Sequence, residues 1–371
     1  MILLRKLLAA AALVALAIGG TPAAAQTNVT GQSVTQRNVL DNPAFNFYQR
    51  GTTAVTGIGS LTTVTYHADR WAGYALSASA SETLTNITSS LPSTSFTNAE
   101  EVQRASSNTI TTPVCLAQEI QSQDLQALAG QQVTLSAWMI AGGNFSAANN
   151  IVTMGVATGQ SPDQGLATFV SPGWGGAASS TAAQAITSSW QRYAQVLTVP
   201  ASLIAPSGLE AAVTFCFTPT GTAGTNDWFQ ITGVQLEQGN SVSLFDQRQV
   251  AVELPRLQRY YSCPIQETSG TALAFFGVGI QQSTTAADIF VPLPQTMRVA
   301  PSFSSSAVGS LELLSGATGT SITSMATPKA ASAGMMVQVS VASGLSAGGT
   351  ASALASGGAL GTGKYCVSAD F

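Results

Sequence analysis

The segment Val133–Ile140 (VTLSAWMI) decides the fold class, because its side chains alternate between two faces. Val133, Leu135, Ala137 and Met139 share one face, as the two-residue period of a β-strand requires. The other face carries the more polar positions, which is typical of a strand that buries one side only. The segment therefore predicts a β-strand at the edge of a hydrophobic core.

Four more segments of this kind lie further along the chain. They are rich in Val, Ile, Thr and aromatic residues, and clusters of Gly, Ser, Asn and Pro separate them. The segments are Ile151–Thr158 (IVTMGVAT), Trp190–Val199 (WQRYAQVLTV), Leu209–Phe217 (LEAAVTFCF) and Trp228–Glu237 (WFQITGVQLE). Short strands with turn-rich connections favour an antiparallel sandwich over alternating strands and helices. We predict an all-β chain with an antiparallel β-sandwich over residues 38–248.

One segment, Gln249–Tyr261 (QVAVELPRLQRYY), has helical periodicity instead. Val250, Leu254 and Leu257 fall on one side of a helix. Pro255 is unfavourable inside a helix, so we expect the helix to begin near Leu254 or to be kinked there.

This segment separates two regions of different composition. We assign residues 249–262 to a connecting helix and residues 263–371 to a smaller C-terminal β domain. The stretch Ser343–Thr362 is rich in Gly, Ala and Ser, but the strand-like Lys364–Phe371 (KYCVSADF) follows it. We therefore expect a loop or hairpin between two strands rather than a free tail.

Charged residues are rare, at 8% of the 371 residues, compared with about 25% in an average protein. A net charge of -4 without a basic stripe argues against nucleic-acid binding. Because the chain has a single histidine, histidine-based acid–base catalysis and a metal site with several histidine ligands are not expected. Hydrophobic residues make up 45%, which argues against a disordered chain. The composition is typical of a non-enzymatic extracellular or structural β protein.

The N-terminus has the pattern of an export signal. Arg5 and Lys6 precede the apolar run Leu7–Ile18, and small residues follow. The run is shorter than the ~20 residues that a membrane-spanning helix needs. We predict a signal peptide over residues 1–25 and a linker over 26–37. The mature protein would then be secreted or periplasmic and would not span a membrane.

The four cysteines are Cys115, Cys216, Cys263 and Cys366, and none belongs to a C-x-x-C pair. They fit an oxidising compartment and allow three pairings. Cys263 and Cys366 lie near the two ends of the C-terminal region, so we pair them with each other and Cys115 with Cys216. Four buried thiols are the alternative.

Three aromatic residues are candidates for contact with a sugar. Trp71 and Tyr74 can form a stacking platform, and the glycines around Trp174 are typical of an exposed loop tip. A structural role is the alternative for each of them. In particular, the run Asp69-Arg70-Trp71 suits a buried ion pair with an aromatic ring stacked on the arginine.

Carboxylates near strand ends are candidates for a structural calcium site. Glu237 ends a strand at a turn, and Asp41 or Asp227 could join it, since calcium binds carboxylate and carbonyl oxygens. No cofactor other than this calcium is implied, and no catalytic residue stands out. We expect His67 to face solvent from a strand.

Motifs in a recognisable order carry a resemblance over most of residues 38–303. They are Asn42–Thr52 (NPAFNFYQRGT) with Tyr66–Trp71 (YHADRW), Trp190–Tyr193 (WQRY) with Leu197–Ala201 (LTVPA), Phe229–Gly239 (FQITGVQLEQG) with Phe245–Arg248 (FDQR) and Glu253–Tyr261 (ELPRLQRYY), and Phe290–Ser302 (FVPLPQTMRVAPS). Together they resemble bacteriophage tail-fibre-type and prophage virion proteins. In that family a carbohydrate-binding-module-like jelly roll precedes a small C-terminal β domain.

The resemblance implies a structural and adhesive protein, assembled as a homotrimer in a virion tail, that attaches to a cell-surface glycan. The chain departs from the family at Leu257, where relatives often have cysteine, and in its export signal. Two alternatives therefore stay open, namely a secreted bacterial glycan-binding protein and a polysaccharide depolymerase.

Overall fold

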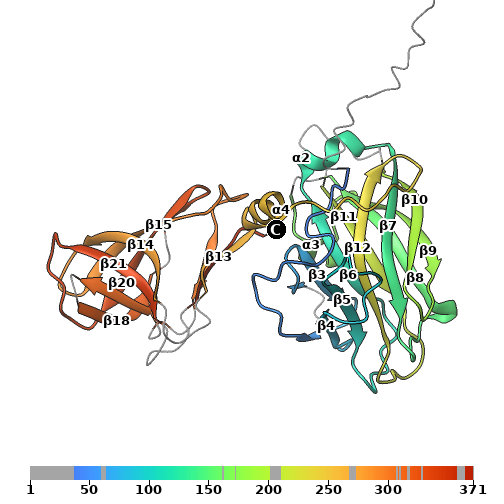
Figure 1. Cartoon of the computed structure of the whole chain (residues 1–371), viewed down its shortest axis with the longest axis horizontal. Helices are drawn as coiled ribbons and strands as arrows, with labels where there is room; N and C mark the ends of the chain where they lie inside the picture. Colours follow the sequence, from blue (N-terminus) through green and yellow to red (C-terminus); the bar gives the residue numbers. More distant parts are fainter. Residues whose placement is uncertain are drawn as a thin grey trace, which may run out of the picture. The chain divides into compact units, whose positions relative to one another are not determined.

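The structure is a computed structural model (Figure 1). It describes residues 37–59, 64–160, 163–171, 173–200, 210–266, 273–305, 308, 311–315, 318–326, 329–356 and 364–370. The predicted signal peptide and linker lie outside these residues, apart from Arg37. In the described part of the chain, no helix is both long enough and apolar enough to cross a membrane.

Two six-stranded antiparallel sheets form the sandwich and confirm the predicted all-β fold. Sheet A contains, in spatial order, β1 (Val55–Ile58), β4 (Glu82–Ile87), β5 (Ala99–Arg104), β12 (Trp228–Gln238), β7 (Gln132–Ala141) and β10 (Gln191–Thr198). Sheet B contains β2 (Thr65–Tyr66), β3 (Trp71–Ala75), β6 (Val114–Ile120), β11 (Glu210–Phe217), β8 (Ile151–Gly159) and β9 (Ala178–Ala185). Several neighbours come from distant parts of the sequence, such as β12 beside β5 and β11 beside β6, as expected for a jelly roll.

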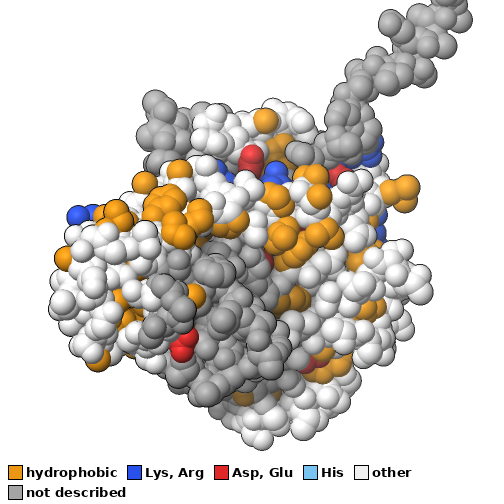
Figure 2. Space-filling model, turned by 60° about the vertical axis from the view of Figure 1, so that its left-hand side comes forward, with side chains coloured by type: hydrophobic (Ala, Val, Ile, Leu, Met, Phe, Trp, Pro, Cys, Tyr) orange, Lys and Arg blue, Asp and Glu red, His pale blue; other side chains and the backbone are white. Residues whose placement is uncertain are grey.

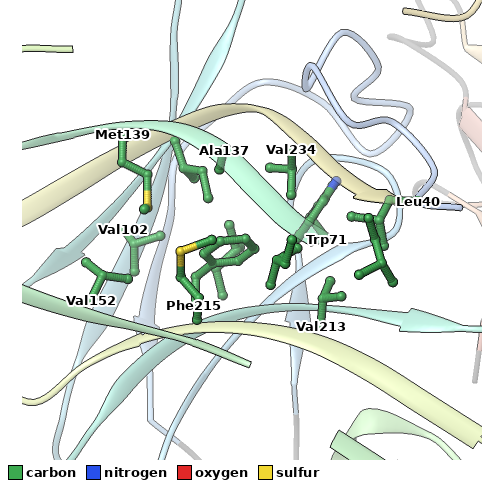
Figure 3. Close-up of a cluster of buried hydrophobic side chains, with 14 of the residues drawn as sticks. Leu40, Trp71, Val102, Ala137, Met139, Val152, Val213, Phe215 and Val234 are labelled. Carbon is green, nitrogen blue, oxygen red and sulfur yellow. The ribbon is translucent and has the colours of Figure 1, made fainter. Parts of the chain in front are cut away.

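The space between the sheets is the main hydrophobic core (Figure 3). The predicted inward face of β7 is fully buried there, with Val133, Leu135, Ala137 and Met139 each 0% exposed. Phe215 on β11 enters the same core from sheet B. The alternation in the sequence therefore identified the buried face correctly.

Short helices connect the strands. They are α2 (Ser122–Leu125), α3 (Leu166–Val170) and α4 (Val250–Gln258), with 3-10 turns η1 (Gln126–Leu128) and η2 (Ala148–Asn150). The α4 helix begins at Val250, earlier than expected, and contains Pro255. A proline here removes one backbone hydrogen bond to the preceding turn. Leu257, at 1% exposed, anchors the helix by its buried side chain.

The C-terminal strands form a second β structure with its own core. A three-stranded sheet contains β13 (Tyr261–Gln266), β22 (Lys364–Ser368) and β16 (Ser302–Ser305). A seven-stranded sheet contains β15 (Ala286–Pro292), β14 (Leu273–Gln281), β21 (Thr350–Ser356), β17 (Leu311–Ser315), β18 (Thr318–Met325), β20 (Gly334–Val341) and β19 (Lys329–Ala331). Because β15 also pairs with β20, six of these strands close into a barrel.

Candidate functional site

Trp71 and Tyr74 are core residues, not the exposed sugar platform that the sequence suggested. Trp71 is 0% exposed, its ring centroid lies 5.1 Å from that of Phe45, and its Nε1 donates to the Asn42 carbonyl oxygen at 3.1 Å. Tyr74 is 4% exposed. Both point into packed surroundings from β3, all of whose side chains are buried. Neither offers a ring face to a ligand.

Trp174 is buried as well, which corrects its assignment to an exposed loop tip. It is 3% exposed and packs on Phe169 of α3, with ring centroids 4.9 Å apart. Its Nε1 donates to the Gly165 carbonyl oxygen at 3.2 Å. The loop folds back because α3 supplies an apolar surface, through Leu166 and Phe169, that covers a large aromatic ring.

The three carboxylates of the predicted calcium site lie apart, and each has protein partners. Asp41 accepts from Arg256 Nε at 2.8 Å, and Asp227 accepts from Arg104 Nε at 2.8 Å. Glu237 accepts from Ser243 Oγ at 2.6 Å. Among the described residues, no cluster of three His, Cys, Asp or Glu side chains could hold a metal ion. The structure thus gives each carboxylate a protein partner, and calcium binding stays a prediction.

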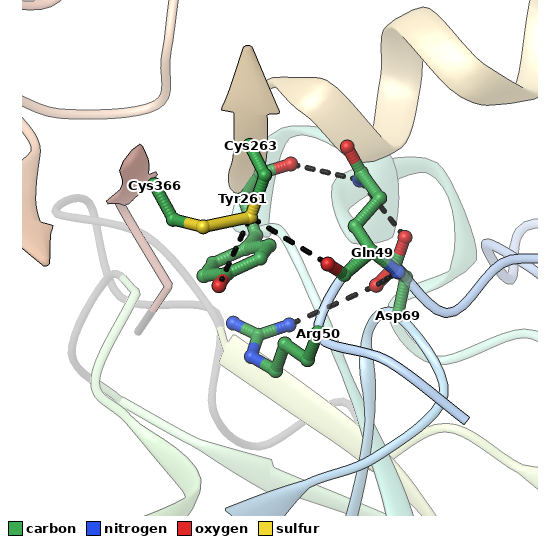
Figure 4. Close-up of a disulfide and its surroundings, with 6 residues drawn as sticks. All are labelled: Gln49, Arg50, Asp69, Tyr261, Cys263 and Cys366. Atoms are coloured by element: carbon green, nitrogen blue, oxygen red, sulfur yellow. Dashed lines mark hydrogen bonds and ion pairs between the residues drawn. A yellow bond between two sulfur atoms is a disulfide. The ribbon is translucent and has the colours of Figure 1, made fainter. Parts of the chain in front are cut away.

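The cysteines pair as the sequence predicted. Cys115 and Cys216 occupy directly opposed positions on β6 and β11, and Cys263 is bonded to Cys366. The second disulfide links β13 to β22 and is shown in Figure 4.

The residues of the motif resemblance meet beside this second disulfide (Figure 4). The Gln49 backbone N–H and side-chain Nε2 donate to the Asp69 carboxylate at 3.0 and 2.8 Å, and Nε2 also donates to the Tyr261 carbonyl oxygen at 2.8 Å. The Arg50 guanidinium lies 3.7 Å from the Tyr261 ring centroid and pairs with Asp370. Burial raises the pKa of Asp69 to about 6. These contacts join sequence-distant segments and are structural.

A second group of motif residues surrounds Asp41. Arg70 and Arg256 reach its carboxylate at 3.5 and 2.8 Å. Arg70 also stacks on Tyr260, 3.6 Å from the ring centroid. The expected stacking of Arg70 on the adjacent Trp71 does not occur, because Trp71 points into the core while Arg70 points toward α4.

A buried acid–histidine cluster lies inside the sandwich. His67 is 1% exposed, contrary to the expected solvent position, and its Nδ1 lies 2.6 Å from Glu100 Oε1. Tyr48 donates to Glu100 Oε2 at 2.9 Å. Burial raises the pKa of Glu100 and, more strongly, that of Glu82 on the neighbouring strand. Because these groups are enclosed by the core, we interpret the cluster as structural.

The outer face of sheet A carries the side chains best suited to contact a ligand. Glu101 and Gln103 on β5, Trp138 on β7, and Trp228 and Gln230 on β12 alternate with core residues and therefore face outward. We call these five residues the sheet A face. All but Gln230, at 9% exposed, are intermediate in exposure. The register places Gln103 opposite Trp228 and Glu101 opposite Gln230.

Neighbouring residues brace both tryptophan rings. A Cβ on Gly142 would lie 2.7 Å from the Trp228 ring, so only glycine at this position lets the indole pack against the backbone of residue 142. Phe96 packs edge-on against Trp138, with centroids 6.5 Å apart. Gly233 has a φ of +59° and passes beneath both Phe96 and Trp138. Trp138 pairs opposite Thr232 on β12, four residues from Trp228, so the backbone positions of the two tryptophans are about 13 Å apart along the strands.

Polar groups lie beside Trp228, on β12 and on the neighbouring strand β5. Gln230 Nε2 donates to Glu101 Oε2 at 2.7 Å, and Gln103 Nε2 donates to the Thr225 carbonyl oxygen at 2.7 Å. Burial raises the pKa of Glu101, and the bond from Gln230 opposes this shift. The amide oxygens and the second carboxylate oxygen are acceptors that can receive hydroxyl donors from a ligand.

Sequence reasoning missed the sheet A face, although a signal for it existed. Trp138, Trp228 and Gln230 lie at the outward positions of two strands that the sequence predicted. What the sequence could not show is that these strands are neighbours in one sheet.

Comparison with known proteins gives structural matches only. No protein-family model and no curated protein matches the chain. A protein from Bacteroides thetaiotaomicron described as sugar binding is 12% identical and covers 54% of this chain and 100% of its own, with a TM-score of 0.33. A CBM4 carbohydrate-binding module is also 12% identical, covering 54% of this chain and 99% of its own, with a TM-score of 0.27.

A third match is the CBM22-1–GH10 part of a Clostridium thermocellum xylanase in complex with xylohexaose. It is 12% identical, covers 51% of this chain and 30% of its own, and has a TM-score of 0.28. These neighbours contain carbohydrate-binding-module-type β-sandwiches, and none of the three is a tail-fibre protein. At such TM-scores the matches carry no argument about what this chain binds.

Proposed function

We propose that this chain is a non-enzymatic glycan-binding protein and that the sheet A face holds the glycan. The observation that carries the proposal is the pair of braced rings, Trp138 and Trp228, with the Gln230–Glu101 pair at a level between them along the strands. Aromatic faces pack against the apolar C–H face of a sugar, while amides and carboxylates accept from its hydroxyls. The spacing of about 13 Å suits several linked sugar units rather than one.

The carboxylates on this face favour binding over cleavage. Glycosidases use two carboxyl groups that are at most about 9.5 Å apart. Glu101 lies opposite Gln230, whereas Glu237 on the same face lies near the far end of β12, about 20 Å away along the strand. Glu100 points to the opposite side, into the core. Among the described residues of this face, no two carboxyl groups are therefore spaced as a polysaccharide depolymerase would need them.

The test compares binding of the wild type and of Trp228→Ala to immobilised neutral polysaccharides, followed by calorimetry with the best oligosaccharide. We expect Trp228→Ala to weaken binding about tenfold or more, as for a central aromatic contact. Leu244→Ala, which removes a side chain 89% exposed outside the sheet A face, is the matched control and should bind normally. Binding should change little with salt, because few charges take part.

Two outcomes count against the proposal. Unchanged binding by folded Trp228→Ala and Trp138→Ala variants would place the site elsewhere. Release of reducing ends from the bound polysaccharide would show an enzyme. The tail-fibre-type role, the homotrimer and the secreted or periplasmic location stay predictions, supported so far only by the motifs and the N-terminal pattern.

A further inference from the structure

The outside of the C-terminal barrel carries a continuous apolar patch. Val278 on β14, Phe290 on β15 and Met336 on β20 are 64%, 52% and 36% exposed, and Ile280 is 57% exposed. The register places Val278 opposite Phe290, and Phe290 opposite Met336, so the three form one row across three strands. We call Val278, Ile280, Phe290 and Met336 the barrel face.

The barrel core does not need these side chains. The alternate residues Ile289, Val291 and Val337 on the same strands point inward and are at most 1% exposed. The outward residues instead line two adjoining surface hollows of about 570 and 580 Å³, which share Phe290 and Met336. Hydrophobic side chains also gather in patches, with few charges, on the face that Figure 2 shows. Contiguous exposed apolar surface of this kind marks an interface.

Two opposite charges flank the barrel face. Asp288 on β15 lies opposite Ile280 and lines one hollow. Lys329 on β19 lies opposite Met336 and lines the other hollow. Neither takes part in an ion pair within the described residues. A surface with an apolar centre, an acid on one side and a base on another is complementary to itself.

We propose that the barrel face is a two-fold interface between two copies of this chain. A two-fold axis apposes the same patch on both copies, so the apolar residues cover each other. Asp288 of each copy then faces Lys329 of the other, which fixes the register while the apolar contacts supply the stability. This inference concerns a surface remote in sequence from the sheet A face and does not depend on glycan binding.

The experiment measures the molar mass of the full chain by light scattering over a dilution series. We expect a concentration-dependent dimer that Phe290→Glu converts to monomer, because the substitution buries an unpaired charge at the centre. Leu244→Glu, an equally acidic change at an exposed residue outside the barrel face, should leave the dimer intact. Melting curves verify that each variant is folded.

A charge exchange tests the register. Asp288→Lys and Lys329→Asp should each weaken the dimer about tenfold by placing like charges together, and the double variant should restore it. A wild type that is monomeric at every concentration would overturn the proposal, and a trimer would overturn it in favour of the homotrimer that the motif resemblance implies. A dimer that persists in Phe290→Glu would place the interface elsewhere, and a double variant without rescue would overturn the two-fold register.

Discussion

Glu82 offers the sharpest test of how the sandwich core is built, because replacing it should stabilise the protein. Its side chain is 0% exposed, and neither carboxyl oxygen has a hydrogen-bond partner within the described residues. Oε1 lies so close to β3 that a Cβ on Gly73 would be 2.6 Å from it. Burial, and then the nearby Glu100, raise the pKa of Glu82 well above its ordinary value.

The magnitude follows from two costs. A buried polar group without a partner costs about 1–3 kcal/mol, which Glu82→Met removes at any pH. In addition, the raised pKa means that the unfolded chain loses the proton first as pH rises. The free energy of unfolding is therefore greatest below the unfolded pKa of about 4.3 and falls by about 1.4 kcal/mol per pH unit until the folded pKa is reached. The benefit of Glu82→Met must accordingly be larger at pH 7 than at pH 4.

Differential scanning calorimetry of wild type and Glu82→Met at pH 4 and pH 7 measures this benefit. Each kcal/mol should raise the Tm by about 2–4 °C for a domain of this size. Glu100→Met is the matched control and should lower the Tm, because it leaves Tyr48 and His67 without their acceptor. A Glu82→Met variant that melts lower at both pH values would refute the reasoning. An equal benefit at both pH values would refute the raised pKa.

Two further predictions follow from buried contacts. Trp174→Ala should lower the free energy of unfolding by about 3–5 kcal/mol, because it empties a packed site beside Phe169. The glycan affinity of this variant should not change, and an unchanged Tm would show that Trp174 is not a core residue. Replacing Cys263 and Cys366 by Ala opens a loop with a sequence separation of 103 and should cost about 4–5 kcal/mol in urea denaturation; an unchanged urea midpoint would contradict this.

The strands were predictable because their signal is local. All five segments inferred from the sequence are strands, and their described ends agree within one residue, as for Val133–Ile140 and the observed Gln132–Ala141. Period-two alternation and turn residues lie within the strand or next to it. The closure of the barrel through β15 and β20 was not predictable, because pairing between Phe290 and Met336 depends on contacts 46 positions apart in the chain.

The ligand-facing residues were harder to predict for a related reason. Glycines beside Trp174 correctly indicate a loop, yet its exposure is decided by α3, which approaches through Leu166 and Phe169. Trp71 follows two charged residues, yet it starts a strand whose side chains are all buried. The local sequence therefore left a structural role open at Trp71 and suggested exposure at Trp174, whereas tertiary packing determined that both are buried.

Apart from Gln230, which belongs to both groups, the residues that carry the family resemblance have a different physical constraint from those proposed to contact a ligand. Gln49 donates hydrogen bonds to both Asp69 and Tyr261 in a largely buried network, and Arg256 donates to the buried Asp41. Changing one member leaves a buried partner unpaired, so such residue types are specified together. Side chains on the sheet A face lie partly in solvent and can change one at a time. A motif resemblance of this kind therefore indicates how the segments of the chain are joined, and it does not identify the glycan site that we propose on the sheet A face.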